Sequence, residues 1–184
     1  MKQSHLTKPK HAIAVASALL AIVTAPAQAT PARAESTPYT MTVITDQAHG
    51  RRVTAGNYQQ AIRRITHNGQ HSRSRFADHN NLCVAYAKTV ELDKAAAACD
   101  AAVEQVRKRE KRAMRSTHPF GAAKHAFKAD LSIALSNRGV LHAVAGKADL
   151  AREDFVAAIE LRSHVSRIAE KNLDRLEQAE LPGT

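Results

Sequence analysis

Residues 137–161, NRGVLHAVAGKADLAREDFVAAIEL, contain the pattern that most constrains the fold of this chain. Two apolar stretches with three- and four-residue spacing lie on either side of Gly146, and this spacing predicts two short amphipathic helices joined by a tight turn. Gly139 in the first stretch and Phe155 in the second fall where the helices would touch. We therefore predict an antiparallel helical hairpin.

The same pattern occurs 56 positions earlier, in residues 81–105. Asn81 aligns with Asn137, and the turn between the two apolar stretches falls at the same place. Cys83 and Cys99 stand where the later copy has its glycine and its phenylalanine. Two related hairpins in one chain indicate an internal repeat.

The composition favours helices throughout. The chain has no Trp, four Phe and three Tyr, so its core has to be built from Ala, Leu, Val and Ile. Closely packed helices suit such residues better than a sandwich of sheets, in which aromatic and β-branched residues are abundant. We predict an all-α fold: a short array of two to three antiparallel helix hairpins with a C-terminal capping helix.

Apolar spacing outlines the helices of this array. We expect a break at residues 67–75, because Asn68 and Gly69 favour a turn. Pro119 is expected to end the helix that runs through RKREKRAMR, since proline lacks a backbone donor. The predicted helices cover residues 55–66, 76–88, 92–115, 122–144, 149–161 and 163–180.

Five residues of the later hairpin resemble the tetratricopeptide repeat family, whose unit is a 34-residue helix-turn-helix. Gly139 matches the small residue of the first helix, Gly146 the turn, and Ala151, Phe155 and Ala158 the small, aromatic and small series of the second helix. AGNYQQAI, residues 55–62, looks like part of a third unit. The spacing of 56 departs from the family's 34, and the usual proline is missing after the second helix.

The resemblance implies a non-catalytic protein-protein interaction or scaffold protein. In this family the first helices line a concave face that binds a protein or peptide partner. One stripe of each first helix would then line that face. These candidate partner-binding residues are Asn81, Val84, Lys88, Asn137, Val140 and Val144. The alternative interpretation is that they are ordinary packing or surface positions.

The first 29 residues have the order of a signal peptide, in which Lys2, Lys8 and Lys10 precede a twelve-residue apolar run. Small residues before the end of APAQA place cleavage after Ala29, with Ala34 as the second choice. An anchored membrane helix is the alternative, but such a helix needs about 20 apolar residues. We expect export to the periplasm or the medium, with no membrane span in the mature chain.

The mature chain is expected to have two parts. Residues 30–45 read as a flexible leader, within which YTMTVIT, residues 39–45, is rich enough in β-branched residues for a short extended segment. One strand cannot stand alone, so this segment either lies along the helices or stays irregular. Residues 46–184 form the predicted helical domain.

Cys83 and Cys99 are the only cysteines, and an exported chain favours a disulfide between them. They lie on the facing sides of two helices joined by a short turn, where a bridge is geometrically allowed. The alternatives are two buried free thiols and, least favoured, a redox-active pair, since no Cys-x-x-Cys arrangement is present.

Little in the sequence indicates catalysis. His67 and His71 have the spacing of metal ligands on a helix, but the turn-prone pair between them favours a solvated loop. His142 is interpreted as a packed or half-exposed histidine. No Gly-rich phosphate loop and no Gly-x-Ser-x-Gly elbow occurs. We expect neither an enzyme nor a cofactor, although an unrecognised hydrolase is a third functional class.

The chain is basic, with a formal charge of +10, and removal of residues 1–29 takes away three Lys and no acid, which leaves +7. The densest basic run comprises Arg107, Lys108, Arg109, Lys111 and Arg112. A solvated helix extension is the simplest interpretation. The alternative function is a structural or stress-related envelope protein whose basic surface binds anionic lipid or polymer. Nucleic acid is not expected, because no aromatic residue interleaves with the run to stack a base.

Overall fold

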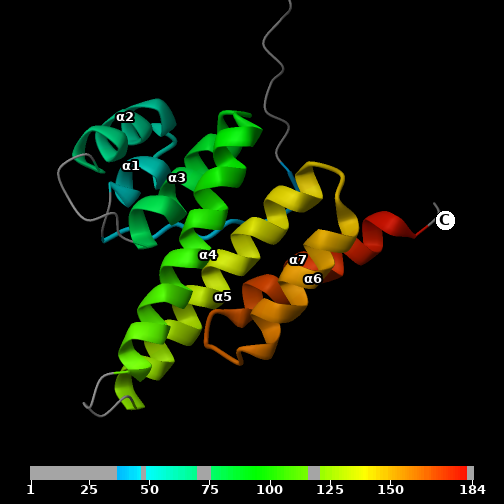
Figure 1. The fold of residues 1–184 in the computed structure, drawn as a ribbon. Helices are drawn as coiled ribbons and strands as arrows, with labels where there is room; N and C mark the ends of the chain where they lie inside the picture. Colours follow the sequence, from blue (N-terminus) through cyan, green and yellow to red (C-terminus); the bar gives the residue numbers. More distant parts are fainter. Residues whose placement is uncertain (1–36, 47–48, 70–75, 116–120, 182–184) are drawn as a thin grey trace, which may run out of the picture. The chain divides into compact units, whose positions relative to one another are not determined.

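The computed structural model describes residues 37–46, 49–69, 76–115 and 121–181, all within the compact unit formed by residues 33–184. The described residues contain seven helices and no strand (Figure 1). The helices are α1 (Gly50–Thr54), α2 (Tyr58–Gly69), α3 (Phe76–Lys88), α4 (Leu92–Met114), α5 (Gly121–Val144), α6 (Ala148–Glu160) and α7 (Ser166–Glu180). The predicted all-α fold is therefore confirmed.

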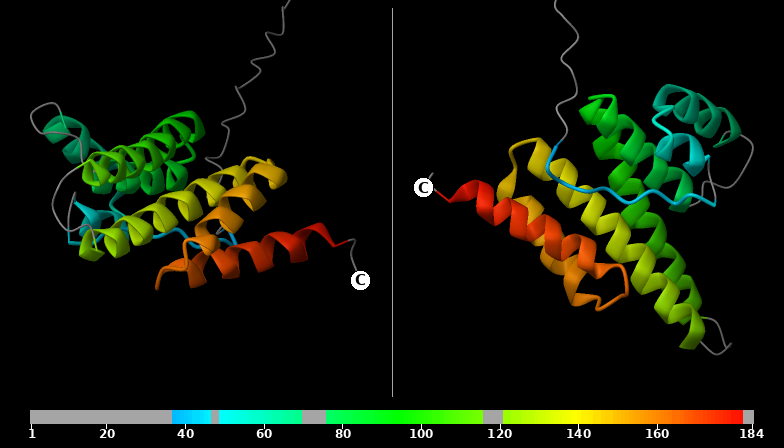
Figure 2. Two further views of the ribbon diagram at one scale, coloured as in Figure 1. Left: turned by 60° about the horizontal axis from the view of Figure 1, so that its bottom comes forward. Right: turned by 180° about the vertical axis from the view of Figure 1, so that it is seen from behind.

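Consecutive helices from α2 to α7 pack against one another, and α3, α5 and α7 also lie side by side. Figure 2 shows α5 between α3 and α7 on one side, with residues 37–46 crossing these three helices. The helices α4 and α6 lie on the other side of α5 in the same views. This arrangement gives α3, α5 and α7 one common face.

Three turns between helices share one hydrogen-bond pattern. Gly56, Val90 and Gly146 each adopt a positive φ, of 78°, 61° and 72°. Each donates its N–H to the carbonyl three residues back, and the next residue donates to the carbonyl five residues back from itself. This pattern satisfies the last carbonyls of a helix and usually requires glycine. Val90 is therefore a β-branched residue in a glycine position.

Gly139 explains how α5 and α6 approach each other. A Cβ atom at this position would lie 2.6 Å from the ring of Phe155 and 3.2 Å from the carbonyl of Ala151. Phe155 and Ala151 are both fully buried. At the matching positions of α3 and α4, Cys83 and Cys99 are joined by a disulfide. The two helix pairs thus use different chemistry at the same point of contact.

Arg138 of α5 links three helices. Its guanidinium donates two hydrogen bonds to the buried carboxylate of Asp154 on α6, at 2.8 and 2.7 Å, and one to Asp100 on α4, at 3.0 Å. The hydrogen bonds to Asp154 raise the pKa of Arg138 despite its partial burial. The pair geometry is bidentate, the strongest arrangement for an arginine and a carboxylate.

Three local features differ from the sequence prediction, and the first is that α7 begins at Ser166 and not at residue 163. The break predicted from residue 67 begins later, because α2 continues to Gly69. The turn-prone Asn68 and Gly69 fall in its last turn, where glycine commonly ends a helix. The short helix α1 was not predicted, since five residues are too few to show an apolar period.

No helix within the described ranges is long and apolar enough to cross a membrane. The predicted signal peptide, both proposed cleavage positions and the leader up to residue 36 lie outside the described residues. The remainder of the leader is described from residue 37, and it lies across α3, α5 and α7.

Candidate functional site

Residues 39–45, here called the strap, run across α7, α5 and α3 (Figure 2, right), with an extended part at residues 40–44 between a bend at Tyr39 and a turn at Thr45. Three asparagines, one on each of these helices, hold the strap by its backbone. Each accepts a hydrogen bond from the N–H of one strap residue and donates one to the carbonyl oxygen of that same residue. The pairs are Asn172 with Thr40 (2.9 and 2.8 Å), Asn137 with Thr42 (2.7 and 2.9 Å) and Asn81 with Ile44 (2.9 and 3.0 Å).

The spacing of these contacts follows from strand geometry. In an extended chain the N–H and C=O of residues i, i+2 and i+4 point to the same edge. An asparagine amide carries one acceptor and two donors, so it matches the two backbone atoms of one residue. Asn81, Asn137 and Asn172, here called the asparagine ladder, therefore bind main-chain atoms that every non-proline residue offers.

The ladder is fully buried beneath a strap that is not. Asn81, Asn137 and Asn172 are at most 1% exposed, as is the neighbouring Asn80, whereas every strap residue is at least partly exposed. Asn80 donates to the Thr42 carbonyl at 3.0 Å and accepts from the Asn137 amide at 2.9 Å. Buried amides are costly unless hydrogen-bonded, so this face of α3, α5 and α7 needs a polar backbone on it.

Side chains of the strap make the apolar contacts. The ring of Tyr39 stacks on Phe155 with 6.5 Å between centroids, and burial followed by the charge of Glu180 raises the pKa of the Tyr39 phenol. Met41 packs against all three apolar clusters of the core. The Thr40 hydroxyl accepts a hydrogen bond from Arg175 at 3.0 Å. The strap is thus recognised at both main chain and side chains.

One polar side-chain atom of the strap is buried without a hydrogen bond among the described residues. The hydroxyl oxygen of Thr42 is buried and has no hydrogen-bond partner among the described residues. Close by, a Cβ atom on Gly50 would lie 1.8 Å from the carbonyl oxygen of Ile44. Glycine at the start of α1 therefore allows the end of the strap to approach the helix.

The predicted partner-binding residues divide into three groups. Asn81 and Asn137 are ladder residues. Val84 and Val140 are 3% and 1% exposed and belong to the apolar clusters. They are therefore buried, although we expected them to line a partner-binding face. Their clusters are nevertheless those on which the strap side chains pack. Lys88 is half-buried at the end of α3, and Val144 is 40% exposed at the end of α5.

Sequence reasoning missed Asn80 and Asn172. Asn172 shares a helix face with the buried Ala169 and Leu176, three residues before it and four after it. A polar residue within an apolar stripe was the available signal. Asn172 also lies 35 positions after Asn137, close to one family unit, but the repeat of 56 does not reach it.

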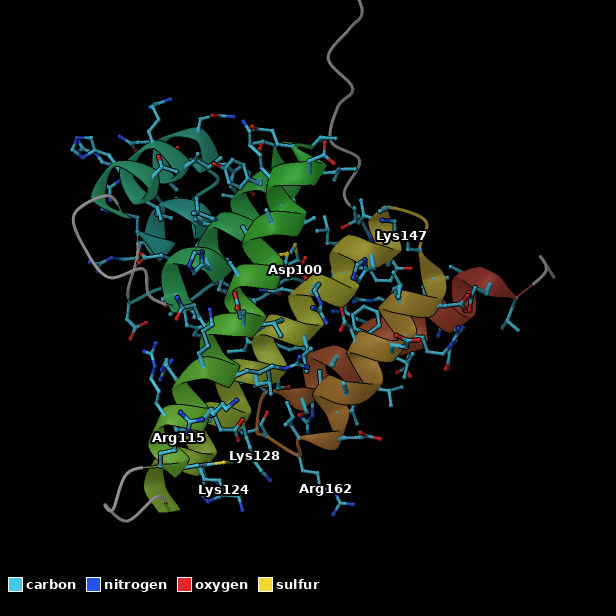
Figure 3. The ribbon with its side chains drawn as sticks, in the orientation of Figure 1. Asp100, Arg115, Lys124, Lys128, Lys147 and Arg162 are labelled. Carbon is cyan, nitrogen blue, oxygen red and sulfur yellow. A yellow bond between two sulfur atoms is a disulfide. The ribbon has the colours of Figure 1, made fainter. Side chains whose placement is uncertain are left out.

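The basic run lies on α4, and two of its members are paired. Lys108 contacts Glu104 at 2.7 Å, and Arg109 contacts Asp130 at 3.0 Å while stacking on the ring of Phe127. Arg107, Lys111 and Arg112 are exposed, and none forms an ion pair within the part of the chain that the structure describes. Arg115, Lys124 and Lys128 extend outward where α4 ends and α5 begins (Figure 3).

Cys83 and Cys99 are bonded and buried. The described ranges contain no group of three residues that could hold a metal ion. Of the weighed histidine pair, His67 lies near the end of α2 and His71 lies outside the described residues. His142 is half-exposed, with its Nε2 atom 3.7 Å from Asp154.

Comparisons of the chain with protein-family models, with curated proteins and with solved structures found no match.

Proposed function

We propose that this protein is a non-catalytic protein-binding module whose asparagine ladder holds an extended segment of a partner. The observation that carries the proposal is the bidentate contact of Asn81, Asn137 and Asn172 with alternate residues of one extended chain. Such contacts bind a peptide main chain with little regard to its sequence, while neighbouring apolar contacts select side chains.

The tetratricopeptide-like arrangement is part of this proposal. Gly56 and Val90 occupy equivalent turns and lie 34 positions apart, the length of one family unit. The residue five positions after each of the three turn residues is a fully buried alanine: Ala61, Ala95 and Ala151. The pairs α3–α4 and α5–α6 would then be two units, α1–α2 a partial unit, and α7 the cap.

An exported location is also proposed. A buried disulfide between Cys83 and Cys99 suits an oxidising compartment such as the periplasm. The N-terminal sequence has the charge and apolar order of a signal peptide. The partner would then be a protein of the cell envelope or the medium.

Photo-crosslinking in cells tests the binding proposal. A photo-reactive residue at Arg175, which contacts Thr40, is expected to capture a partner. The same residue at Val156, which is 39% exposed on α6, is not. Capture should be lost on Asn172→Ala and retained on Asn57→Ala, a matched change at an exposed asparagine. A partner captured equally from both positions, or insensitive to Asn172→Ala, would contradict the proposal.

A second candidate function is binding of an anionic surface by the basic run. It is favoured by the exposed, unpaired state of Arg107, Lys111 and Arg112 within the described residues. Clustered cations attract anionic lipid at about 1 kcal/mol per residue near the surface. This function would depend on the basic run of α4 and would not involve the asparagine ladder.

Vesicle sedimentation tests the second candidate. The triple variant Arg107→Gln, Lys111→Gln, Arg112→Gln is expected to lose retention on phosphatidylglycerol vesicles at low salt. A control with the same loss of charge neutralises three exposed arginines elsewhere: Arg51, Arg63 and Arg64. Equal loss in both variants would show that net charge alone is responsible.

A further inference from the structure

The strap occupies the ladder as a bound peptide would. It makes no ladder contact through its own side-chain polar atoms; all six ladder bonds go to its main chain. It lies at the surface over the ladder asparagines, which are at most 1% exposed beneath it. Four buried amides are an unusual base for a permanent apolar contact, but a suitable one for a peptide site.

We infer that the strap is an internal competitor, and that the partner of the proposed function binds by replacing it with a similar extended segment. This inference rests on the proposed function. It adds the chemistry of the partner and the way in which access to the ladder is controlled.

The strap defines the segment that fits. The place of Tyr39 takes an aromatic side chain, because Phe155 offers a ring to stack on. The place of Met41 takes a long apolar side chain, which reaches all three core clusters. The places of Thr40, Thr42 and Ile44 exclude proline, since each must donate an N–H to the ladder.

The strap is also an imperfect ligand. The buried Thr42 hydroxyl lacks a partner among the described residues, and burying such a group without a hydrogen bond is unfavourable. Valine has nearly the same shape without the hydroxyl. A partner segment of the form aromatic, threonine, methionine, valine, valine, isoleucine would therefore bind more tightly than the strap sequence.

Because the strap is tethered to the ladder, a partner segment must exceed a minimum affinity to displace it. A tethered segment acts at an effective concentration on the order of 1 mM. A partner at micromolar concentration must therefore bind the ladder about a thousandfold more tightly than the strap, or meet a chain whose strap is weakened. Thr42→Pro weakens it, because proline removes the N–H that donates to Asn137 and leaves the ladder unchanged.

The test uses a fluorescent peptide of residues 37–46 and the full mature chain. We expect the peptide to bind the Thr42→Pro chain at least about tenfold more tightly than the wild-type chain, as loss of one buried hydrogen bond implies. A peptide with valine at position 42 should bind better still. Peptides with proline at position 42 or alanine at position 39 should bind more weakly, and Asn137→Ala in the Thr42→Pro chain should abolish binding.

A second measurement needs no variant. In an isotope-labelled wild-type chain, excess unlabelled peptide should speed the amide hydrogen exchange of Thr40, Thr42 and Ile44 by about tenfold or more as it displaces the strap. The inference is overturned if these amides stay protected at saturating peptide, since the strap would then be a fixed part of the core. That result would leave a partner captured from Arg175 to be explained by another mode of binding.

The molar mass in solution shows whether the strap of a second copy of this chain can occupy the ladder. Light scattering of the Thr42→Pro chain mixed with the wild-type chain should give monomers. Dimers would show that the ladder takes the strap of a second copy, and this would overturn the assignment to a different protein. Displacement of the strap with no partner captured in cells would support the competitor mechanism while contradicting the proposed function.

Discussion

Asn137 holds both polar main-chain atoms of Thr42: its Oδ1 atom accepts the Thr42 N–H at 2.7 Å, and its Nδ2 atom donates to the Thr42 carbonyl at 2.9 Å. The same Nδ2 atom also donates to Asn80 at 2.9 Å. Asn137→Ala would remove three hydrogen bonds at once and leave the Thr42 N–H and the Asn80 side-chain oxygen without these partners, while the Thr42 carbonyl still accepts from Asn80. We expect the free energy of unfolding, measured by urea denaturation, to fall by about 2–4 kcal/mol.

Two control variants show whether the stability loss of Asn137→Ala comes from its hydrogen bonds to the strap or from any asparagine-to-alanine change. Asn57→Ala, at the exposed residue that precedes α2, should cost no more than about 1 kcal/mol, the usual effect of losing an asparagine at a helix N-cap. Asn172→Ala should lower the free energy of unfolding by less than Asn137→Ala does, because Asn172 binds Thr40 near the N-terminal end of the strap and Asn137 binds Thr42 at its centre. If Asn137→Ala were as mild as Asn57→Ala, the ladder bonds would not be present in solution.

The helices were predictable because their signals are local. Spacing of apolar residues marks α3, α4, α5 and α6 within a residue or two of their observed bounds. The self-similarity at 56 positions paired Asn81 with Asn137, and the structure gives these two residues the same contacts with the strap. The two hairpins therefore share this contact as well as their sequence pattern.

The strap contacts could not be predicted in the same way. Thr40 and Asn172 are 132 residues apart, and Thr42 and Asn137 are 95 apart. Each strap residue contributes only main-chain atoms to the ladder, which are identical at every position and leave no mark in the sequence. The ladder itself shows only as asparagines on apolar faces, which resemble tolerated exceptions until the helices are assembled.

Thr42→Val is expected to stabilise the protein. The buried hydroxyl that it removes has no partner among the described residues, valine is nearly isosteric, and it favours extended backbone. We expect a gain of up to about 1 kcal/mol in urea denaturation. Thr45→Val, at an exposed strap position, serves as the control and should be close to neutral. A loss of stability on Thr42→Val would mean that the hydroxyl is hydrogen-bonded in solution.

Val90→Gly is expected to stabilise the turn between α3 and α4. Val90 has a φ of 61° and is 57% exposed, so glycine would relieve backbone strain and lose little packing. The gain should be about 1 kcal/mol in the free energy of unfolding, measured by urea denaturation. The reciprocal change Gly146→Val adds a side chain to open space in an equivalent turn. It should cost a similar amount, and equal effects of opposite sign would confirm the shared geometry.

The disulfide is expected to contribute through the unfolded chain. Cys83 and Cys99 are 16 positions apart, and closing a loop of that length stabilises a protein by about 3 kcal/mol in the chain-entropy description. Reduced wild-type protein should lose this amount while its two thiols still fill the core. Cys83→Ala with Cys99→Ala should lose more, because packing is removed as well. Mass spectrometry after alkylation without reductant should detect no labelled thiol.

Asp130 offers a pH test with an unexpected sign. Burial raises the pKa of its carboxyl, and the hydrogen bond from Arg109 at 3.0 Å lowers it by less. The folded state therefore binds a proton more tightly than the unfolded state, so this group's contribution to stability falls as pH rises from its ordinary pKa of 3.8 through the raised value. Above that window the charged carboxylate is a net cost in spite of its ion pair. Asp130→Asn should stabilise the protein slightly at pH 7, by less than about 1 kcal/mol, and should have no such benefit near pH 3. Urea denaturation at both pH values measures this difference, and destabilisation at pH 7 would show that the pair with Arg109 outweighs burial.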